Sequence, residues 1–326
     1  MDEVFARRDV IDSQTLKRLC EPSDARGTLQ ALSHLGAIAA TGTLLWVTYG
    51  TWWAVPVFMV HGALINFLYA GQHELSHFTV FRTRWLNEWV GRVFGFALFY
   101  PRTFDLVQHV AHHRFTQDWR RDGELARDRY TLSSYLWWMS GVSYWYTRWR
   151  RILRFSHGLV TEPYLPPKRH HEFIREARIH AAGYALIAAV SVAEQSWAAV
   201  TLWLAPMLAM KFVHQLQNTI EHLGLSHEPN VLVNTRSTRT NAVLRWAAWQ
   251  MQYHTAHHAF PGVPFHHLRE LHEHIFCKRG TMPPTMTYLG FQAQVLRAFA
   301  GGKTESYYPD DGTWIEDENP KGADNR

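Results

Sequence analysis

The chain has 326 residues, of which 47% are hydrophobic, and its formal net charge is +5 at neutral pH. Its two cysteines are too few for a disulfide framework or for a cysteine-ligated zinc or iron–sulfur site. The basic residues flank apolar segments and do not alternate with aromatic ones, which excludes an ordinary nucleic-acid-binding surface. The 21 histidines are the anomaly of the composition and require a chemical reason.

The first apolar segments predict a membrane hairpin. Residues 1–29 are charged and lack the apolar core of a signal peptide, so we expect a cytosolic N-terminal segment. Two uncharged runs of 20 residues follow, Gln30–Tyr49 and Thr51–Ala70. A helix of that length, at ~1.5 Å per residue, can cross the hydrocarbon core of a bilayer. The range 30–70 is therefore interpreted as an antiparallel transmembrane pair.

Two aromatic segments after this hairpin are typical of helices that lie in the membrane interface. Trp85–Phe99 and Tyr135–Phe155 mix Trp, Tyr and Arg with aliphatic residues. For the second segment, a core helix with an Arg-rich end is an equally good interpretation. The basic residues considered as holders of an acidic headgroup are Arg114, Arg148, Arg150, Arg151 and Arg154.

A second, shorter hairpin is predicted over 179–213. Its uncharged arms have 15 residues, Ile179–Ala193, and 16 residues, Gln195–Met210. For both arms to cross a bilayer fully, Arg178 and Lys211 would have to extend their charged ends toward the headgroups.

The distribution of basic residues predicts the orientation. The loops after Ala70 and Met210 are rich in arginine, whereas the turns at Gly50 and Glu194 carry no Lys or Arg. By the positive-inside tendency, both termini and both large loops face the cytoplasm. The expected organisation is all-α and multi-pass, with about four transmembrane helices in one domain. That domain is 30–300, with a cytosolic helical cap from 71–178 and 214–300 and a polar, flexible tail at 301–326.

Four histidine clusters lie beyond the ends of the apolar runs. Their sequences are HELSH at 73–77, HVAHH at 109–113, NTIEH at 218–222 and HTAHH at 254–258. Residues three or four apart share one helical face, with Cβ atoms ~5–6 Å apart, so such rings can converge on a metal. Imidazole suits several metals, and its presence does not name one. The number of candidate ligands exceeds the ~4 of a single tetrahedral zinc and indicates two metals.

The ordered set of boxes resembles the membrane fatty acid desaturase superfamily, over roughly Gln30 to His274. The resemblance implies four transmembrane helices and a cytosolic cap, in which nine histidines and an asparagine-bound water hold two irons. Carried onto this sequence, the ligands would be His73, His77, His109, His112, His113, His222, His254, His257 and His258, with Asn218 at the position of the asparagine. Nearby carboxylates are expected to orient the metal-bound rings, and the candidates are Glu74, Asp118, Asp122 and Glu221.

The resemblance also implies an activity. We expect O₂-dependent oxidation of C–H bonds in a fatty-acyl or lipid-like substrate, most simply desaturation. Hydroxylation and oxidative decarboxylation on the same scaffold stay open, because fold membership does not fix the reaction outcome. No catalytic residue beyond the metal ligands is assigned. Without a haem-binding domain or a cysteine set, the electrons would come from a separate ferredoxin-like or rubredoxin-like carrier with its reductase.

Two alternatives belong to other classes. His73–His77 fits the HExxH motif of zinc metalloproteases, with Glu74 as general base. Such a protease needs only one further ligand, which leaves both HxxHH boxes unexplained. A metal transporter would place polar residues near the bilayer midplane. Here His61 and Asn66 are the main polar candidates in the first hairpin, and the clusters lie beyond the helix ends.

Overall fold

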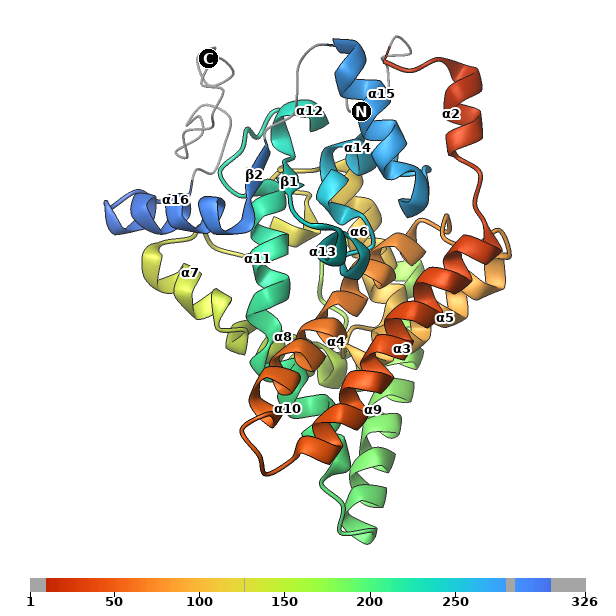
Figure 1. Ribbon diagram of the computed structural model, residues 1–326, viewed down its shortest axis with the longest axis vertical. Coiled ribbons are helices and arrows are strands. Elements are labelled where there is room, and N and C mark those ends of the chain that lie inside the picture. Colours follow the sequence, from red (N-terminus) through yellow and green to blue (C-terminus); the bar gives the residue numbers. More distant parts are fainter. Residues whose placement is uncertain (1–9, 126, 280–284, 306–326) are drawn as a thin grey trace.

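The computed structural model describes residues 10–125, 127–279 and 285–305, and this part of the chain is mostly helical (Figure 1). Most of the polar tail predicted at 301–326 lies outside the described residues. Two short strands, β1 (Ser237–Arg239) and β2 (Thr285–Thr287), pair in parallel. The mainly helical fold predicted from the sequence is confirmed, and this strand pair is the addition to it.

Two long helices have the length and hydropathy to cross a membrane. They are α3 (Asp24–Thr48) and α4 (Ala54–Ser76), which pack against each other as a hairpin. The side chain of Ser23 accepts a hydrogen bond from the backbone N–H of Arg26 and so caps the start of α3. Helix α4 continues past the predicted apolar run, and its last turn carries the first histidine box. Two candidate ligands, His73 and His77, therefore lie at the end of a helix that is itself a candidate membrane span.

The second hairpin consists of α9 (His170–Ala193), a π-helical segment (Val200–Leu204) and α10 (Ala205–Ala209). The chain reverses near Gln195, which has a positive φ of 48°. Among the described helices, only α3 and α4 have the apolar length of a membrane span, so two candidate spans stand where four were predicted. The physical reason is that charged residues occupy the first half of α9, while the other arm is interrupted by the π-helical segment and Pro206.

Three helices leave apolar side chains exposed in the way expected of interfacial elements. On α5 (Arg84–Ala97), the side chains of Trp85, Trp89 and Val93 form an exposed stripe with helical spacing. The segment predicted as one helix, Tyr135–Phe155, is divided into α7 (Leu132–Met139) and α8 (Val142–Ser156). Gly141 separates them with a φ of 80°, a conformation that glycine adopts readily. The exposed apolar residues on these two helices are Leu136, Trp137, Val142, Tyr146, Trp149 and Leu153.

The remaining elements form a cap at the end of the molecule opposite the hairpin turns (Figure 1). They are α2 (Ser13–Leu19), α6 (Arg102–Arg114), η1 (Gly123–Leu125), η2 (Pro167–Arg169), α11 (Lys211–His222), α12 (Val231–Asn234), α13 (Ala242–Ala247), η4 (Met251–Tyr253), α14 (His254–Ala259), η5 (Phe265–His267), α15 (Leu268–Arg279) and α16 (Tyr288–Ala300). Helices α4, α6 and α11 connect the hairpins to the cap, because each of them packs against helices of both parts.

The close packing of α4 on α10 depends on Gly62. A Cβ atom at Gly62 would overlap the carbonyl oxygen of Pro206 and lie 2.7 Å from Cγ of Met210. Gly62→Ala should therefore lower the free energy of unfolding by about 1–3 kcal/mol, the usual cost of overpacking, measured as a lower Tm in detergent. Gly36→Ala on α3 is the control, because nothing lies within 4 Å of that position. Equal melting temperatures for the two variants would contradict the contact.

Candidate metal centre

Nine histidines from four helices meet where the first membrane hairpin joins the cap. Helices α4 and α11 each place candidate ligands in their last turn, and α6 and α14 each carry one HxxHH box. Seven of the nine side chains are buried, and His77 and His222 are partly exposed. The structure thus brings together every histidine that the sequence analysis proposed as a ligand, from positions 73 to 258.

Five rings form the first group, here called cluster A. Its members are His73, His77, His109, His113 and His257, and one ligand atom from each lies within 4.8 Å of all the others. The Nε2 atoms of His73 and His257 are 2.8 Å apart. Those of His77 and His109 are 2.7 Å apart. The rings therefore present nitrogen lone pairs to a common point.

Four rings form the second group, cluster B. Its members are His112, His222, His254 and His258, again with ligand atoms within 4.8 Å of one another. The Nε2 atom of His222 lies 3.2 Å from that of His112 and 2.8 Å from that of His254. Asn218, one turn before His222 on α11, lines a cavity of ≈ 80 Å³ together with His112 and His222. The asparagine therefore lies beside cluster B, in a position open to a small molecule.

Helix geometry explains how each HxxHH box serves both clusters. Consecutive residues of an α-helix differ by ~100° in direction, whereas residues four apart nearly coincide. His109 and His113 therefore point to cluster A, while His112 points to cluster B. The same division separates His257 from His258. One short helix can in this way supply ligands to two neighbouring metals.

The donor set fits metal ions. Two neutral imidazoles whose Nε2 atoms face each other can share only one proton, and the buried Nε2 atoms of His113 and His258 have no protein partner. Burial holds the pKa of His254 and of His258 well below the usual range, so these rings stay neutral. Neutral imidazole is the form that binds metal. A cation at each cluster would satisfy the nitrogens that the protein leaves without partners.

Carboxylates approach the opposite side of three rings. Nδ1 of His112 hydrogen-bonds to both oxygens of Asp122, at 2.9 and 3.0 Å. Oε1 of Glu74 lies 3.1 Å from Nδ1 of His257, and Oε1 of Glu221 lies 3.6 Å from Nδ1 of His254. Burial lowers the pKa of His112, but Asp122, Glu124 and Glu221 together outweigh burial, and the pKa is raised to about 9. A carboxylate at Nδ1 holds the proton on that nitrogen, and a metal that binds Nε2 displaces the other proton.

One predicted carboxylate lies elsewhere. The Asp118 carboxylate accepts a hydrogen bond of 2.6 Å from Nε of Arg121, and it contacts none of the nine rings among the described contacts. Three groups that were not predicted from the sequence lie near Nδ1 atoms of the clustered rings. Glu124 lies 3.8 Å from His109, Thr116 Oγ1 3.3 Å from His258, and the backbone oxygen of Asn234 3.2 Å from His222. Glu124 and Thr116 closely follow the second box and could have been considered, whereas a backbone carbonyl carries no sequence signal.

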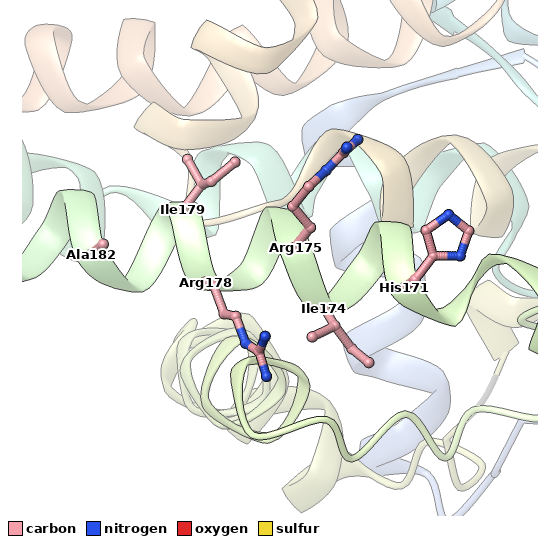
Figure 2. Close-up of a pocket in the computed structure, with 6 residues that line it drawn as sticks. All are labelled: His171, Ile174, Arg175, Arg178, Ile179 and Ala182. Carbon is pink, nitrogen blue, oxygen red and sulfur yellow. The ribbon is translucent and has the colours of Figure 1, made fainter.

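A larger hollow lies away from the clusters, on the outer side of α9 (Figure 2). It measures ≈ 570 Å³ and is lined by His171, Ile174, Arg175, Arg178, Ile179 and Ala182. Figure 2 shows Arg175 and Arg178 pointing to opposite sides of the helix, and Nε of Arg178 donates a hydrogen bond to the backbone oxygen of Ser156. Its basic groups do not converge on one ligand, and the candidate site is therefore the histidine centre.

The fold and the two clusters define a helical, membrane-associated protein with a histidine-rich centre suited to metal. The family model for fatty acid desaturases matches residues 50–288, and the chain belongs to this family. It is accordingly an oxidoreductase of lipid metabolism, as the resemblance of the histidine boxes implied.

Three characterised relatives are similar to this chain at low identity, and each is an sn-1 oleoyl-lipid 12-desaturase. The protein of Arthrospira platensis is 24% identical over 266 residues, which cover 69% of either chain. That of Synechocystis sp. is 21% identical over 296 residues, covering 81% of this chain and 80% of the relative. That of Anabaena variabilis is 21% identical over 294 residues, covering 82% of this chain and 67% of the relative.

Proposed function

We propose that this protein is an O₂-dependent diiron oxidase that acts on C–H bonds of a fatty-acyl or lipid-like chain, with desaturation as its reaction. The observation that carries the proposal is the pair of adjacent histidine clusters at the end of a candidate membrane span. The similarity to lipid desaturases supports the reaction type. Hydroxylation and oxidative decarboxylation are the alternatives that the product would distinguish.

In this proposal, cluster A holds one iron and cluster B the other, with Asn218 beside cluster B. Two irons bound there would serve to activate O₂, which is the oxidant, and the protein would supply position and protonation. Asp122 holds the proton at Nδ1 of His112 and so fixes the orientation of that ring, while Glu74 and Glu221 lie beside His257 and His254. Seven of the nine rings are buried, and the apolar core beside α4 and α6 limits the access of bulk water to them.

The protease alternative fits Glu74 poorly. A general base of a zinc protease must reach the water that it activates. The Glu74 side chain is fully buried, and Oε2 accepts a hydrogen bond of 3.1 Å from the backbone N–H of Phe265. Its other oxygen lies against His257. Glu74 is thus placed to orient a ring, and a zinc protease that used His73, His77 and one further ligand would leave six of the nine clustered histidines without a role.

Membrane topology and electron supply complete the proposal. Both hairpins cross the bilayer within one domain, 30–300, and the clusters and both termini face the cytoplasm. The arginine-rich loops around the cap support this orientation. A separate ferredoxin-like or rubredoxin-like protein, with its reductase, delivers the electrons, because two cysteines in the whole sequence cannot hold an iron–sulfur centre.

Metal analysis tests the proposal first. Detergent-purified protein from iron-enriched cells should contain about two coupled irons per chain by elemental analysis and Mössbauer spectroscopy. Incubation with reductant, carrier and O₂ should then yield an acyl product with two fewer hydrogens. A hydroxylated or decarboxylated product would replace desaturation by the corresponding alternative. About one zinc and no iron would contradict the diiron proposal and favour the protease.

A further inference from the structure

A lysine is buried where α11 meets α8. Lys211 begins α11, and its side chain is only 2% exposed. Its Nζ lies 2.8 Å from Nδ1 of His214 and 3.6 Å from the ring centroid of Tyr144. The absence of a side chain at Gly141 makes room for it, because a Cβ atom there would lie 2.8 Å from Cβ of Lys211. The site is therefore built around this side chain.

A second cation lies close by. The guanidinium of Arg148 packs on the rings of Tyr100 and Tyr144, at 3.4 and 4.5 Å from their centroids. In the described contacts, no carboxylate forms an ion pair with Lys211 or Arg148. The carboxylate of Asp105 is already engaged, since its Oδ2 accepts hydrogen bonds from Gln72 and Ser76.

Two donors in the same place also lack acceptors. Nε of Arg148 and Nε1 of Trp145 are buried and have no hydrogen-bond partner. The Trp145 ring lies 5.7 Å from Nζ of Lys211. Buried donors without acceptors are costly, and so is the placement of two cationic side chains close together, and an anion would relieve both. The arrangement has the chemistry of an anion-binding site.

The site is connected to the metal centre through aromatic contacts. The ring of Tyr69 lies 4.5 Å from that of His214 and 6.4 Å from that of His73, a member of cluster A. Lys211, His214, Asn218 and His222 share one face of α11, and ~1.5 Å per residue places Lys211 ~10 Å along the helix from Asn218. The exposed apolar stripes of α7 and α8 put this region at the membrane interface, where the acid group of an amphiphile lies.

We propose that Lys211 and Arg148 bind the carboxylate of a free fatty acid whose chain extends toward clusters A and B. The inference rests on the proposed oxidase function and narrows its substrate from acyl lipids in general to the unesterified acid. A carboxylate is small and planar, and it accepts hydrogen bonds from both cations at once. Tyr144, His214 and Gly141 enclose Lys211 closely, and a carboxylate is smaller than a glycerophosphate headgroup.

Competition binding on the full-length, metal-loaded protein tests this assignment. Radiolabelled palmitate is bound and then displaced by unlabelled palmitate, methyl palmitate or dipalmitoyl phosphatidylglycerol. Palmitate should compete about 10- to 100-fold better than its ester, the range expected for loss of a charge-assisted hydrogen bond. The affinity of Lys211→Met for palmitate should be lower than that of the parent protein by the same factor, and its affinity for the ester should be unchanged. Lys168→Met, at an exposed lysine, should bind both like the parent protein.

Several outcomes would overturn the inference. They are equal competition by acid and ester, parental palmitate affinity in Lys211→Met, or stronger competition by phosphatidylglycerol. If Lys211→Met loses its metal and so does not fold, Arg148→Gln decides in its place by the same comparison. The binding of palmitate can be measured whether or not the protein catalyses a reaction. A protein that selects palmitate but oxidises no acyl chain would contradict the proposed function and leave the carboxylate site intact.

Discussion

Replacing His258 with alanine should remove about one metal ion per chain and abolish oxidation. His258 contributes one of the four rings of cluster B, and its Nε2 has no protein partner that could compensate. The three remaining rings would bind metal weakly. The loss of metal affinity should exceed the ~10- to 100-fold loss that is typical when a group hydrogen-bonded to a metal ligand is removed. Elemental analysis of the purified variant measures the metal, and product formation with the parent protein's substrate measures activity.

His272→Ala is the matched control. His272 is also buried, but it packs on Tyr253 and Phe276 and belongs to neither cluster. This variant should keep two metals per chain, although its melting temperature can fall because a packed ring is lost. Full metal content and full activity in the His258 variant would show that cluster B is not a metal site.

Asp122→Asn should weaken metal binding by about 10- to 100-fold while the protein stays folded. The Asp122 carboxylate accepts hydrogen bonds from Nδ1 of His112 and from the backbone N–H groups of Gln117 and Glu124. An amide of the same shape keeps one acceptor oxygen but loses the negative charge that favours the proton on Nδ1. Titration of the metal-loaded variant with a chelator measures the change in affinity.

Asp118→Asn is the control for this variant, four residues away in the same turn. Asp118 pairs with Arg121 at the surface, and a surface ion pair contributes little, so metal affinity should stay at the parental value. If the two variants lost metal equally, the effect would come from the conformation of the loop and not from the contact with His112.

The sequence alone predicted the histidines that gather in clusters A and B, as well as the helical class of fold, because both depend on local spacing. The pattern of His109, His112 and His113 is visible without a structure, as is the uncharged run that becomes α4. The division of the rings between the two clusters was not predicted, because it depends on the rotation of α6, α11 and α14 relative to one another. The same holds for Glu124 and the carbonyl of Asn234, whose contacts arise from loop conformation.

Two other features depend on tertiary structure in a different way. The aromatic segment Tyr135–Phe155 has helical composition throughout, but Gly141 takes a positive φ and separates α7 from α8. A full crossing of the second hairpin predicts that Lys211 extends toward the headgroups, whereas its side chain is buried beside Tyr144. Helical periodicity indicates the face of a helix but does not indicate which neighbouring helix covers it.

The four rings of cluster B also constrain when the centre can form during synthesis. His112 and His222 leave the ribosome before His254 and His258. During this time the other two rings of cluster B have not yet been synthesised. Translation proceeds at ~5–20 residues per second, which leaves these side chains exposed for seconds near a newly inserted hairpin. The order of the boxes along the sequence therefore means that cluster B can be complete only after the last box, at 254–258, has been synthesised.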